Sequence, residues 1–454
     1  MRVIRLRLLT PLALAAAILG LVLSSAGCSE VATLRRRVDV EVKAFWPHPE
    51  FVPTPLPYVD LAPQTALAEA LTATLPALVP VLPDLDSAPT VQPDGVATPT
   101  AAPALTPIAT LLPQRPIVPT ITPAPTRRPT RPAGEPPFAV QLAGVTHMWQ
   151  TWNNCGPATL AMYLSYFGQR VKQDEIGAAL RPDPDDKNVS LEEMAAYARN
   201  RGLSAVVRVN GDARRLQRLI AAGVPVLIET WHEERPNDGM GHYRLLTGYD
   251  DDAGHWIAYD SFDARGLVKG EPYTGIRLPY DETERLWAVF NRLYLVLYDA
   301  AHAPAVLLIL SEDADEAVMW SRALARSQAE VQLRPDDPFA WFNLGSNLVA
   351  LGRFREAVQA YDRARRIGLP WRMLWYQFGP FQAYYEIGRY DDVIALAEHT
   401  IATARQTEEG FYWRGMAQRA RGDLVGARAS WQRAVELNPH YKPAVTALAQ
   451  LDGH

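Results

Sequence analysis

Cys155 lies where a loop meets an apolar helix, and this position suits a thiol that acts as a nucleophile. Gly156 and Pro157 fit a first helical turn, because proline there loses no hydrogen bond that the helix needs. The run 158–167 then continues as an apolar helix. A thiol at a helix N-terminus faces unpaired N–H groups and the positive end of the helix dipole, and both favour the thiolate. The alternative is a small buried hydrophobic residue, as most free cysteines are.

A histidine and a carboxylate follow at a spacing that can serve this thiol. Two β-rich runs, 242–249 and 255–262, flank an Asp/Gly cluster and predict a hairpin. If the turn centres on Asp251, His242 pairs directly opposite Asp260, and opposed residues point to the same face. A slip of one residue puts them on opposite faces. As neighbours, they supply a base and the group that orients it, which thiol catalysis requires.

Residues 1–28 are typical of an export signal. Three arginines precede the apolar run 8–23, and Ser25-Ala26-Gly27-Cys28 resembles a bacterial lipobox, in which Cys28 is lipidated and becomes the mature N-terminus. An uncleaved membrane anchor is the alternative. In either case the rest of the chain is expected outside the cytoplasm, anchored to the bacterial cell membrane. If Cys28 carries lipid, Cys155 has no disulfide partner in an oxidising compartment, so its thiol is expected to have a use.

The composition excludes one class of partner and predicts a stalk. The chain has 45 basic and 50 acidic residues and a net charge of −5, so it has no basic excess for binding nucleic acid. Its 38 prolines cluster between about residues 47 and 137. Pro/Thr/Ala-rich sequence cannot bury enough apolar surface to offset ordering entropy, so residues 29–137 are predicted to form a disordered, extended linker. This linker is either a spacer that holds the catalytic part away from the bilayer or a tolerated insertion.

Between Cys155 and the hairpin the pattern alternates between helices and strands. The acidic loop 181–189 lacks the glycine and the closing glutamate of a calcium loop. Ser190 and Glu193 instead predict a capping box. The expected elements are a helix over 191–201, a strand over 203–209, a helix over 213–222 and a buried strand over 224–228. His147, His232 and His255 are interpreted as surface or packing residues. No His, Cys and carboxylate set has metal-ligand spacing, so neither a metal nor another cofactor is predicted.

The order of these motifs resembles the C39-like cysteine peptidases of the papain-like fold. The resemblance covers residues 138–298 and rests on Gln150, Asn154-Cys155-Gly156-Pro157-Ala158, Gly223-Val224-Pro225-Val226, His242-Tyr243, Gly248-Tyr249-Asp250 and Asp260. It implies an α+β papain-like domain over residues 138–300, with Cys155 as nucleophile and His242 as general base and acid. It also implies that Asp260 holds the imidazole and that Gln150 donates to the oxyanion. Ser261 stands where the family often has proline, and Arg244 is expected to form a structural ion pair.

After residue 298 the pattern becomes helical and repetitive. Similar segments begin at Gly352, Gly388 and Gly422, spacings of 36 and 34 residues, and resemble tetratricopeptide repeats. The resemblance implies an all-α solenoid over residues 310–454 that binds a peptide or protein partner in a concave groove. The alternative is that the array only stabilises or spaces the enzyme. An aromatic cluster in the middle repeat is interpreted as core and consists of Trp371, Trp375, Tyr376, Phe378, Tyr384 and Tyr385.

The sequence therefore predicts an exported, membrane-tethered cysteine peptidase that hydrolyses peptide bonds through Cys155, His242 and Asp260. Its expected partners are a peptide or protein substrate, a protein bound by the repeats, and the membrane through the lipid on Cys28. Two alternatives stay open. One is a catalytically inactive C39-like binding or scaffold protein. The other is a thiol-dependent amidase or acyltransferase, because acyl-thiol chemistry serves several acceptors.

Overall fold

The computed structural model describes residues 49–57, 131–132, 134–233 and 238–453 of the chain. The predicted export signal and the predicted lipidation site Cys28 lie outside these described residues. So do the parts of the predicted linker at residues 29–48, 58–130 and 133. Within the described ranges, every helix is too short or too polar to cross a membrane.

A seven-stranded antiparallel sheet forms the centre of the sheet region, which we define as residues 137–310. Its strand order is β2-β7-β3-β4-β5-β6, and β1 pairs with the end of β4. The strands are β1 (Ala139–Gln141), β2 (Ser204–Arg208), β3 (Val226–His232), β4 (Met240–Asp250), β5 (His255–Asp260), β6 (Ile276–Pro279) and β7 (Tyr294–Tyr298).

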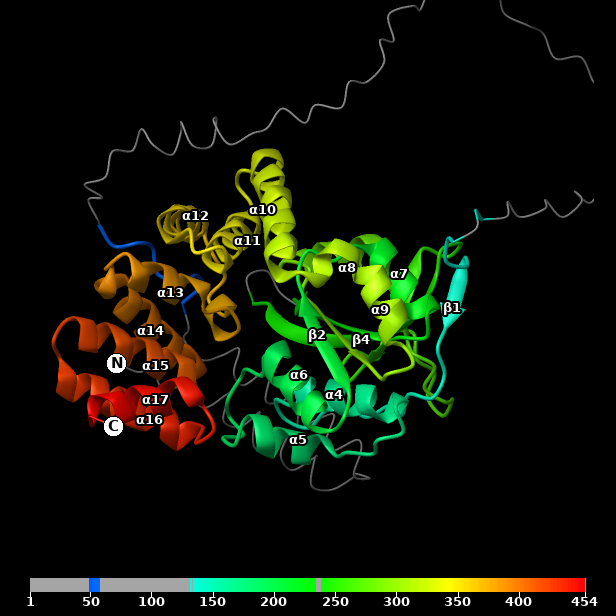
Figure 1. The fold of residues 1–454 in the computed structure, drawn as a ribbon, viewed down its shortest axis with the longest axis horizontal. Helices are drawn as coiled ribbons and strands as arrows, with labels where there is room; N and C mark the ends of the chain where they lie inside the picture. Colours follow the sequence, from blue (N-terminus) through cyan, green and yellow to red (C-terminus); the bar gives the residue numbers. More distant parts are fainter. Residues whose placement is uncertain (1–48, 58–130, 133, 234–237, 454) are drawn as a thin grey trace, which may run out of the picture. The chain divides into compact units, whose positions relative to one another are not determined.

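Helices cover both faces of this sheet (Figure 1). One face carries α4 (Cys155–Tyr166), α5 (Gln173–Leu180) and α6 (Leu191–Asn200), and the other carries α7 (Ala213–Ala221), α8 (Tyr280–Ala288) and α9 (Ala303–Leu310). Strand β7, which lies next to the edge strand β2, contacts both helical layers, because its side chains alternate between the two faces of the sheet. Leu295 and Leu297 pack with α4 and α6, whereas Tyr294, Val296 and Tyr298 pack with α7 and α9.

The predicted elements of this region are present. The apolar helix predicted over 158–167 is α4, which begins at Cys155 itself. The capping box predicted before α6 also forms. Glu193 N–H donates to Ser190 Oγ at 3.3 Å, and Ser190 N–H donates to Glu193 Oε2 at 2.8 Å. These two bonds satisfy amide groups that a bare helix start leaves unpaired, so the sequence fixes the beginning of α6 locally.

The predicted hairpin is also present, but the predicted pairing of His242 directly opposite Asp260 is wrong. Asp260 lies opposite Arg244, and His242 lies two residues further along β4, opposite Thr230 of β3. The turn also lies later in the chain than predicted, since Asp250 pairs with His255 and the turn is therefore centred between Asp252 and Ala253. His242 and Asp260 are therefore diagonal neighbours on one face.

A bulge in β4 decides which face Asp260 occupies. From the turn to Gly248 the strands follow one register, which then shifts by one residue between Leu246 and Gly248. Without this shift Asp260 would oppose Leu245, whose side chain points to the other face of the sheet. The extra residue, Thr247, thus returns Asp260 to the face of Arg244 and His242.

The helical region, residues 316–451, consists of helices that each pack on the next. They are α10 (Glu316–Leu333), α11 (Pro338–Ala350), α12 (Phe354–Ile367), α13 (Gly379–Glu386), α14 (Tyr390–Ala404), α15 (Glu408–Ala420), α16 (Leu424–Leu437) and α17 (Lys442–Leu451). Short 3-10 turns lie at Ser311–Ala314 and Met373–Trp375. Two helix pairs meet through a glycine. A Cβ on Gly345 would approach the Tyr361 ring to 2.6 Å, and one on Gly415 the Trp431 ring to 2.5 Å.

Residues 50–56, which we call the strap, pack on the helical region and are blue in Figure 1. Val52 N–H donates to Leu369 O at 2.8 Å, and the Val52 side chain is 2% exposed within the helical core. Arg365 donates to Pro53 O at 2.8 Å and to Thr54 O at 3.0 Å. The linker prediction is therefore wrong for this stretch, because its backbone finds partners and its valine a buried site.

Candidate active site

Cys155 is the first residue of α4 and is half-buried. The loop before it turns through Asn153, whose φ of 59° is in the left-handed region that asparagine tolerates better than most residues. Asn153 Nδ2 holds this turn by donating to Asp186 O at 2.7 Å. The thiol therefore lies at the helix N-terminus, beside backbone N–H groups that have no partner within the helix.

His242 and Asp260 form a buried pair next to this thiol. His242 Nε2 lies 2.9 Å from Asp260 Oδ1, and the two residues are 4% and 0% exposed. Burial lowers the pKa of His242, but the Asp260 charge, its hydrogen bond and a hydrogen bond with Cys155 raise this pKa to about 9. Because Nε2 is engaged by Asp260, Nδ1 is the nitrogen left for Cys155. At neutral pH an imidazolium therefore lies beside the thiol.

Asp260 binds other groups besides the His242 ring. Burial raises its pKa, but His242 and Arg244 together hold this pKa well below its usual range. Arg244 Nε lies 3.0 Å from Asp260 Oδ2, and the backbone N–H groups of Phe262 and Asp263 donate to Oδ1 at 2.7 and 2.8 Å. The carboxylate is thus ionised and held from four directions, which fixes the orientation of the imidazole. The ion pair expected for Arg244 is present.

Gln150 lies at the same site, and a serine fixes its amide. Gln150 N–H donates to Ser261 O at 2.9 Å, and Ser261 Oγ donates to Gln150 Oε1 at 2.8 Å. Since the amide oxygen accepts from Ser261, the amide NH2 is the end that remains to donate in the cleft. The sequence marked Ser261 only as a departure from a family pattern, and no local signal pointed to this contact, because 111 residues separate it from Gln150.

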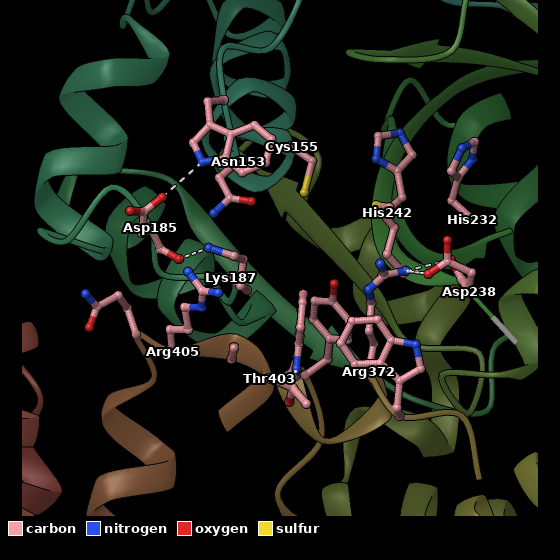
Figure 2. Close-up of a pocket in the computed structure, with 18 of the residues that line it drawn as sticks. Asn153, Cys155, Asp185, Lys187, His232, Asp238, His242, Arg372, Thr403 and Arg405 are labelled. Atoms are coloured by element: carbon pink, nitrogen blue, oxygen red, sulfur yellow. Dashed lines mark hydrogen bonds and ion pairs between the residues drawn. The ribbon is translucent and has the colours of Figure 1, made fainter. Parts of the chain in front are cut away.

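The cleft that contains these groups has a volume of about 510 Å³. Figure 2 shows Cys155 and His242 on one side of it, and Arg372, Thr403 and Arg405 of the helical region on the other. Gln150 also lines the cleft, whereas Asp260 lies buried behind His242. The structure therefore brings together all four predicted catalytic residues. Cys28, the predicted lipidation site, lies outside the described residues.

The helical region forms one wall of the cleft, and its residues there correct the interpretation of the aromatic cluster. Trp371, Trp375 and Tyr376 line the cleft, although the sequence placed the whole aromatic cluster in the core. Tyr384 is buried in the helical core as expected, and Phe378 and Tyr385 pack against that core. Helical periodicity could not separate the two groups, because Trp371 and Tyr376 lie just outside the short turn Met373–Trp375, between the longer helices.

Two further residues near the thiol were not among the predicted site residues. Arg181 is 5% exposed and donates to Pro184 O at 2.9 Å and to Asn154 Oδ1. Burial lowers its pKa, while the charges of Asp186 and Cys155 act in the opposite direction. His232 lines the cleft, and its ring packs against Phe262 and His242, with centroids 5.5 and 5.8 Å away, which agrees with its interpretation as a surface or packing residue.

His147 packs beneath the site, as the sequence suggested. Its ring stacks on Tyr273 at 3.5 Å between centroids, and its Nε2 lies 2.8 Å from Asp260 O. Burial lowers the pKa of His147, so the ring is expected to be neutral at pH 7. Across the described part of the chain, no group of three His, Cys, Asp or Glu residues is placed to hold a metal ion.

Comparison with known families agrees with this geometry at the level of the domain. Residues 137–290 match the model of the family described as the Peptidase_C39 like family. This part of the chain is therefore a C39-like peptidase-family domain, as the motif order implied. No curated protein matches the chain.

Several solved structures resemble parts of the chain. A putative C39-like peptidase from Bacillus anthracis is 17% identical, covers 36% of this chain and 98% of its own, and has a TM-score of 0.28. The peptidase domain of Streptococcus ComA, a bi-functional ABC transporter involved in quorum sensing, is 14% identical, covers 35% and 99%, and has a TM-score of 0.27. MamA from Desulfovibrio magneticus RS-1 is 20% identical, covers 30% and 75%, and has a TM-score of 0.27.

Proposed function

We propose that this protein is an exported, membrane-tethered cysteine peptidase that hydrolyses peptide bonds through Cys155, His242 and Asp260. One observation carries the proposal. A thiol at a helix N-terminus shares a cleft with a histidine whose other ring nitrogen is bound by a buried carboxylate. This arrangement supplies a nucleophile, a proton carrier and the group that orients the carrier.

In the first half of the reaction the Cys155 proton resides on His242, and the thiolate attacks the carbonyl carbon of the peptide bond. The negative charge that develops on the carbonyl oxygen is met by Gln150 Nε2 and by the backbone N–H of Cys155. His242 then gives its proton to the leaving amine, the C–N bond breaks, and a thioester to Cys155 remains.

In the second half water replaces the amine. His242, now neutral, takes a proton from the water as it attacks the thioester carbonyl. The C–S bond breaks, the acid product leaves, and the proton returns to the Cys155–His242 pair. Asp260 stays ionised throughout, because His242 and Arg244 both favour its charged form.

The helical region is proposed to be a tetratricopeptide-type array that binds a protein partner. The glycine contacts support this assignment. Gly345 meets Tyr361 and Gly415 meets Trp431, so each pair joins a glycine to an aromatic residue 16 positions later, in successive helices. Repetition of the same contact along the chain is the pattern that stacked helical repeats require.

The anchor is proposed to be the lipid on Cys28. Because the strap begins at Glu50, 21 residues separate the anchor from the folded unit, and they span roughly 70 Å at most when fully extended. Residues 58–130 lie between the strap and β1, so both neighbours of this segment belong to the folded unit. On this proposal the Pro-rich segment is not the spacer between membrane and peptidase.

Mass spectrometry of the full chain after treatment with a thiol-directed peptidase probe tests the catalytic proposal. Wild type is expected to carry one probe adduct on Cys155 and to cleave peptides from a mixed library, and Cys155→Ala to do neither. Labelling with cleavage by both proteins would reject Cys155 as the nucleophile. Labelling of wild type without cleavage or acyl transfer would favour the binding-protein alternative. New amide products in the presence of added amines, in excess over hydrolysis, would favour an acyltransferase.

A further inference from the structure

The helical region touches the sheet region directly beside His242. The Tyr376 ring packs over Gly241, where an added Cβ would lie 3.2 Å from two ring carbons, and the Tyr376 hydroxyl is hydrogen-bonded to the Gly241 backbone. Gly241 immediately precedes His242 in β4. The wall formed by the helical region is therefore within one side-chain length of the reacting groups.

The polar atoms of Trp375 and Tyr376, which belong to this wall, are already engaged within the protein. Trp375 Nε1 donates to Thr403 Oγ1 at 3.0 Å, and the Tyr376 hydroxyl is held at Gly241 as described. Trp371 and Trp375 meet edge to face with 5.1 Å between centroids. Trp375 and Tyr376 therefore present the surfaces of their aromatic rings to the cleft.

Arg372, one of the two arginines of the helical region that line the cleft, is engaged as well. Arg372 Nη1 donates to Asp238 O at 2.7 Å and lies 2.5 Å from the carboxylate of the same residue. Its guanidinium also lies over the Trp371 ring at 4.2 Å from the centroid. Because its charge is balanced by Asp238 and one of its faces is covered by the indole, Arg372 is poorly placed to bind a substrate carboxylate.

Resting on the proposed peptidase function, we propose that Trp375 and Tyr376 form the specificity pocket of the site. We infer that its occupant is a large apolar or aromatic side chain next to the peptide bond that is cut. Met240 and Phe262 of the sheet region line the same cleft, so apolar surface is available from both regions. A large apolar side chain gains by leaving water for such a surface, whereas glycine brings no side chain and aspartate loses hydration without gaining a partner.

The test compares the full-length protein with Trp375→Ala, using peptides that differ only in the residue beside the cleaved bond. Cleavage sites in a mixed peptide library are first read by mass spectrometry. One cleaved peptide is then made with Phe, Leu, Gly or Asp at that position. Wild type is expected to prefer Phe and Leu. Trp375→Ala is expected to lower kcat/KM for the Phe peptide by about tenfold or more, as removal of a large apolar contact does, and to change the Gly peptide little.

Two further variants keep this test interpretable. Trp341→Ala is the matched control. Like Trp375, Trp341 is a half-buried tryptophan of the helical region, and its Nε1 donates to Pro335 O at 2.8 Å. Trp341 does not line the cleft. It is expected to leave the peptide preference unchanged. Thr403→Val keeps the Trp375 ring but removes its hydrogen bond, and it is expected to weaken the Phe preference to an intermediate degree.

The outcomes separate this proposal from the peptidase proposal. If Cys155 is alkylated rapidly and peptides are cleaved, but cleavage does not depend on the size of the neighbouring side chain, only the specificity pocket is overturned. An equal loss on the Phe and Gly peptides in Trp375→Ala would overturn it too. If wild type cleaves nothing, calorimetric binding of the same peptides to Cys155→Ala decides. Tighter binding of the Phe peptide that disappears with Trp375→Ala supports the pocket, and equal binding of all peptides rejects it.

Discussion

Asp260 lies directly opposite Arg244 and diagonal to His242, so one buried carboxylate is shared by a guanidinium and an imidazole. The sharing follows from the bulge at Thr247, which brings all three side chains to one face of the sheet. It gives Asp260 two separable tasks. One is to hold the His242 ring and keep it protonated, and the other is to neutralise a guanidinium that is 2% exposed.

The first prediction concerns the pH dependence of turnover. The pKa of His242 is raised to about 9, so kcat/KM should fall as the pH rises through about 9, where His242 loses the proton that the leaving amine needs. Asp260→Asn removes the charge that raises this pKa, so the alkaline limb should move to lower pH. The exposed carboxylate Asp281 provides the control, since Asp281→Asn should leave the limb in place. If the alkaline limb is unchanged in Asp260→Asn, Asp260 does not raise the pKa of His242.

The same substitution should also destabilise the fold, by a different route. Asp260→Asn leaves the buried Arg244 charge without its carboxylate, and breaking a buried pair in this way costs about 3–5 kcal/mol. The raised pKa of His242 contributes stability that is fully present below pH 6.5 and is lost as the pH rises through about 9. Thermal unfolding should therefore show a lower Tm for Asp260→Asn throughout, with the gap to wild type narrowing above pH 9.

The second prediction concerns the reactivity of Cys155. Cys155 is hydrogen-bonded to His242, which is placed to take up the thiol proton. Iodoacetamide should therefore alkylate Cys155 rapidly near pH 7, and His242→Ala should slow this reaction strongly. Rates are measured by intact mass. His147→Ala is the control, because His147 lies beneath the site and contacts the Asp260 backbone rather than the thiol. Equal rates in wild type and His242→Ala would show that the histidine does not activate the thiol.

The third prediction concerns the oxyanion donor. Gln150→Ala should lower kcat by about 100-fold or more if its amide meets the developing charge. Ser261→Ala should lower kcat by a smaller factor with little change in KM, since Ser261 acts only by orienting that amide. Ser261→Thr keeps the hydroxyl and should recover most of the loss. A Ser261→Ala effect confined to KM would instead place Ser261 in substrate binding.

Local sequence signals predicted those parts of the molecule that depend on neighbouring residues. The capping box at Ser190, the apolar helix after Cys155 and the hairpin turn all follow from residues within a few positions of each other. The register of the hairpin was missed for two reasons. The turn is centred between Asp252 and Ala253 rather than on Asp251, and the bulge at Thr247, which leaves no mark in an alternating pattern, then shifts the pairing by one residue. His242 and Asp260 still share a face, since the predicted and observed registers differ by an even number of residues.

Contacts between distant segments could not be predicted in this way. The strap was assigned to the linker because its prolines resemble those that follow, and only the site beneath Val52 distinguishes it. Trp375 and Tyr376 were assigned to a core because aromatic residues in helical repeats are usually buried. Their position in the cleft depends on how the helical region packs against β4, and a single sequence carries no direct signal of that packing.

The fourth prediction concerns a buried acidic contact between the sheet and helical regions. Asn188 Nδ2 donates to Glu409 Oε1 at 3.0 Å, and Glu409 is 9% exposed. Burial raises the pKa of Glu409 well above its usual value of 4.5, and the charges of Glu408 and Asp186 add to this increase. A carboxyl with a raised pKa binds its proton more tightly in the folded state. Its contribution to stability is therefore greatest at low pH and falls as the pH rises above about 4.5.

Glu409→Gln removes this ionisation while keeping an acceptor for Asn188. The variant should have a higher Tm than wild type at pH 8, by about 2 °C or more if the buried charge costs about 1 kcal/mol. Near pH 4.5 the two proteins should differ less. Glu398→Gln on α14 makes the same chemical change at an exposed position and should alter the Tm little at either pH. A lower Tm for Glu409→Gln at pH 8 would mean that the ionised carboxylate stabilises the contact.

The fifth prediction concerns the strap. Within residues 58–130, Arg127 provides the basic residue that is not followed by proline, so limited trypsin digestion should cut after it. The N-terminal piece should nevertheless stay with the rest of the protein on size exclusion under native conditions, because the strap hydrogen-bonds to Leu369 and Arg365. Denaturant should separate the two pieces.

Val52→Asp places a charge in the apolar site under the strap and should release the N-terminal piece after the same cut. Thr54→Asp is the matched control, since it adds the same charge two residues away on an exposed side chain and should leave the pieces together. If the N-terminal piece is released from wild type after the cut, the strap does not bind stably to the helical region. Retention in wild type together with release from Val52→Asp would mean that the segment before residue 50 leads directly to the folded unit, so that a lipid on Cys28 would keep the cleft within roughly 70 Å of the membrane.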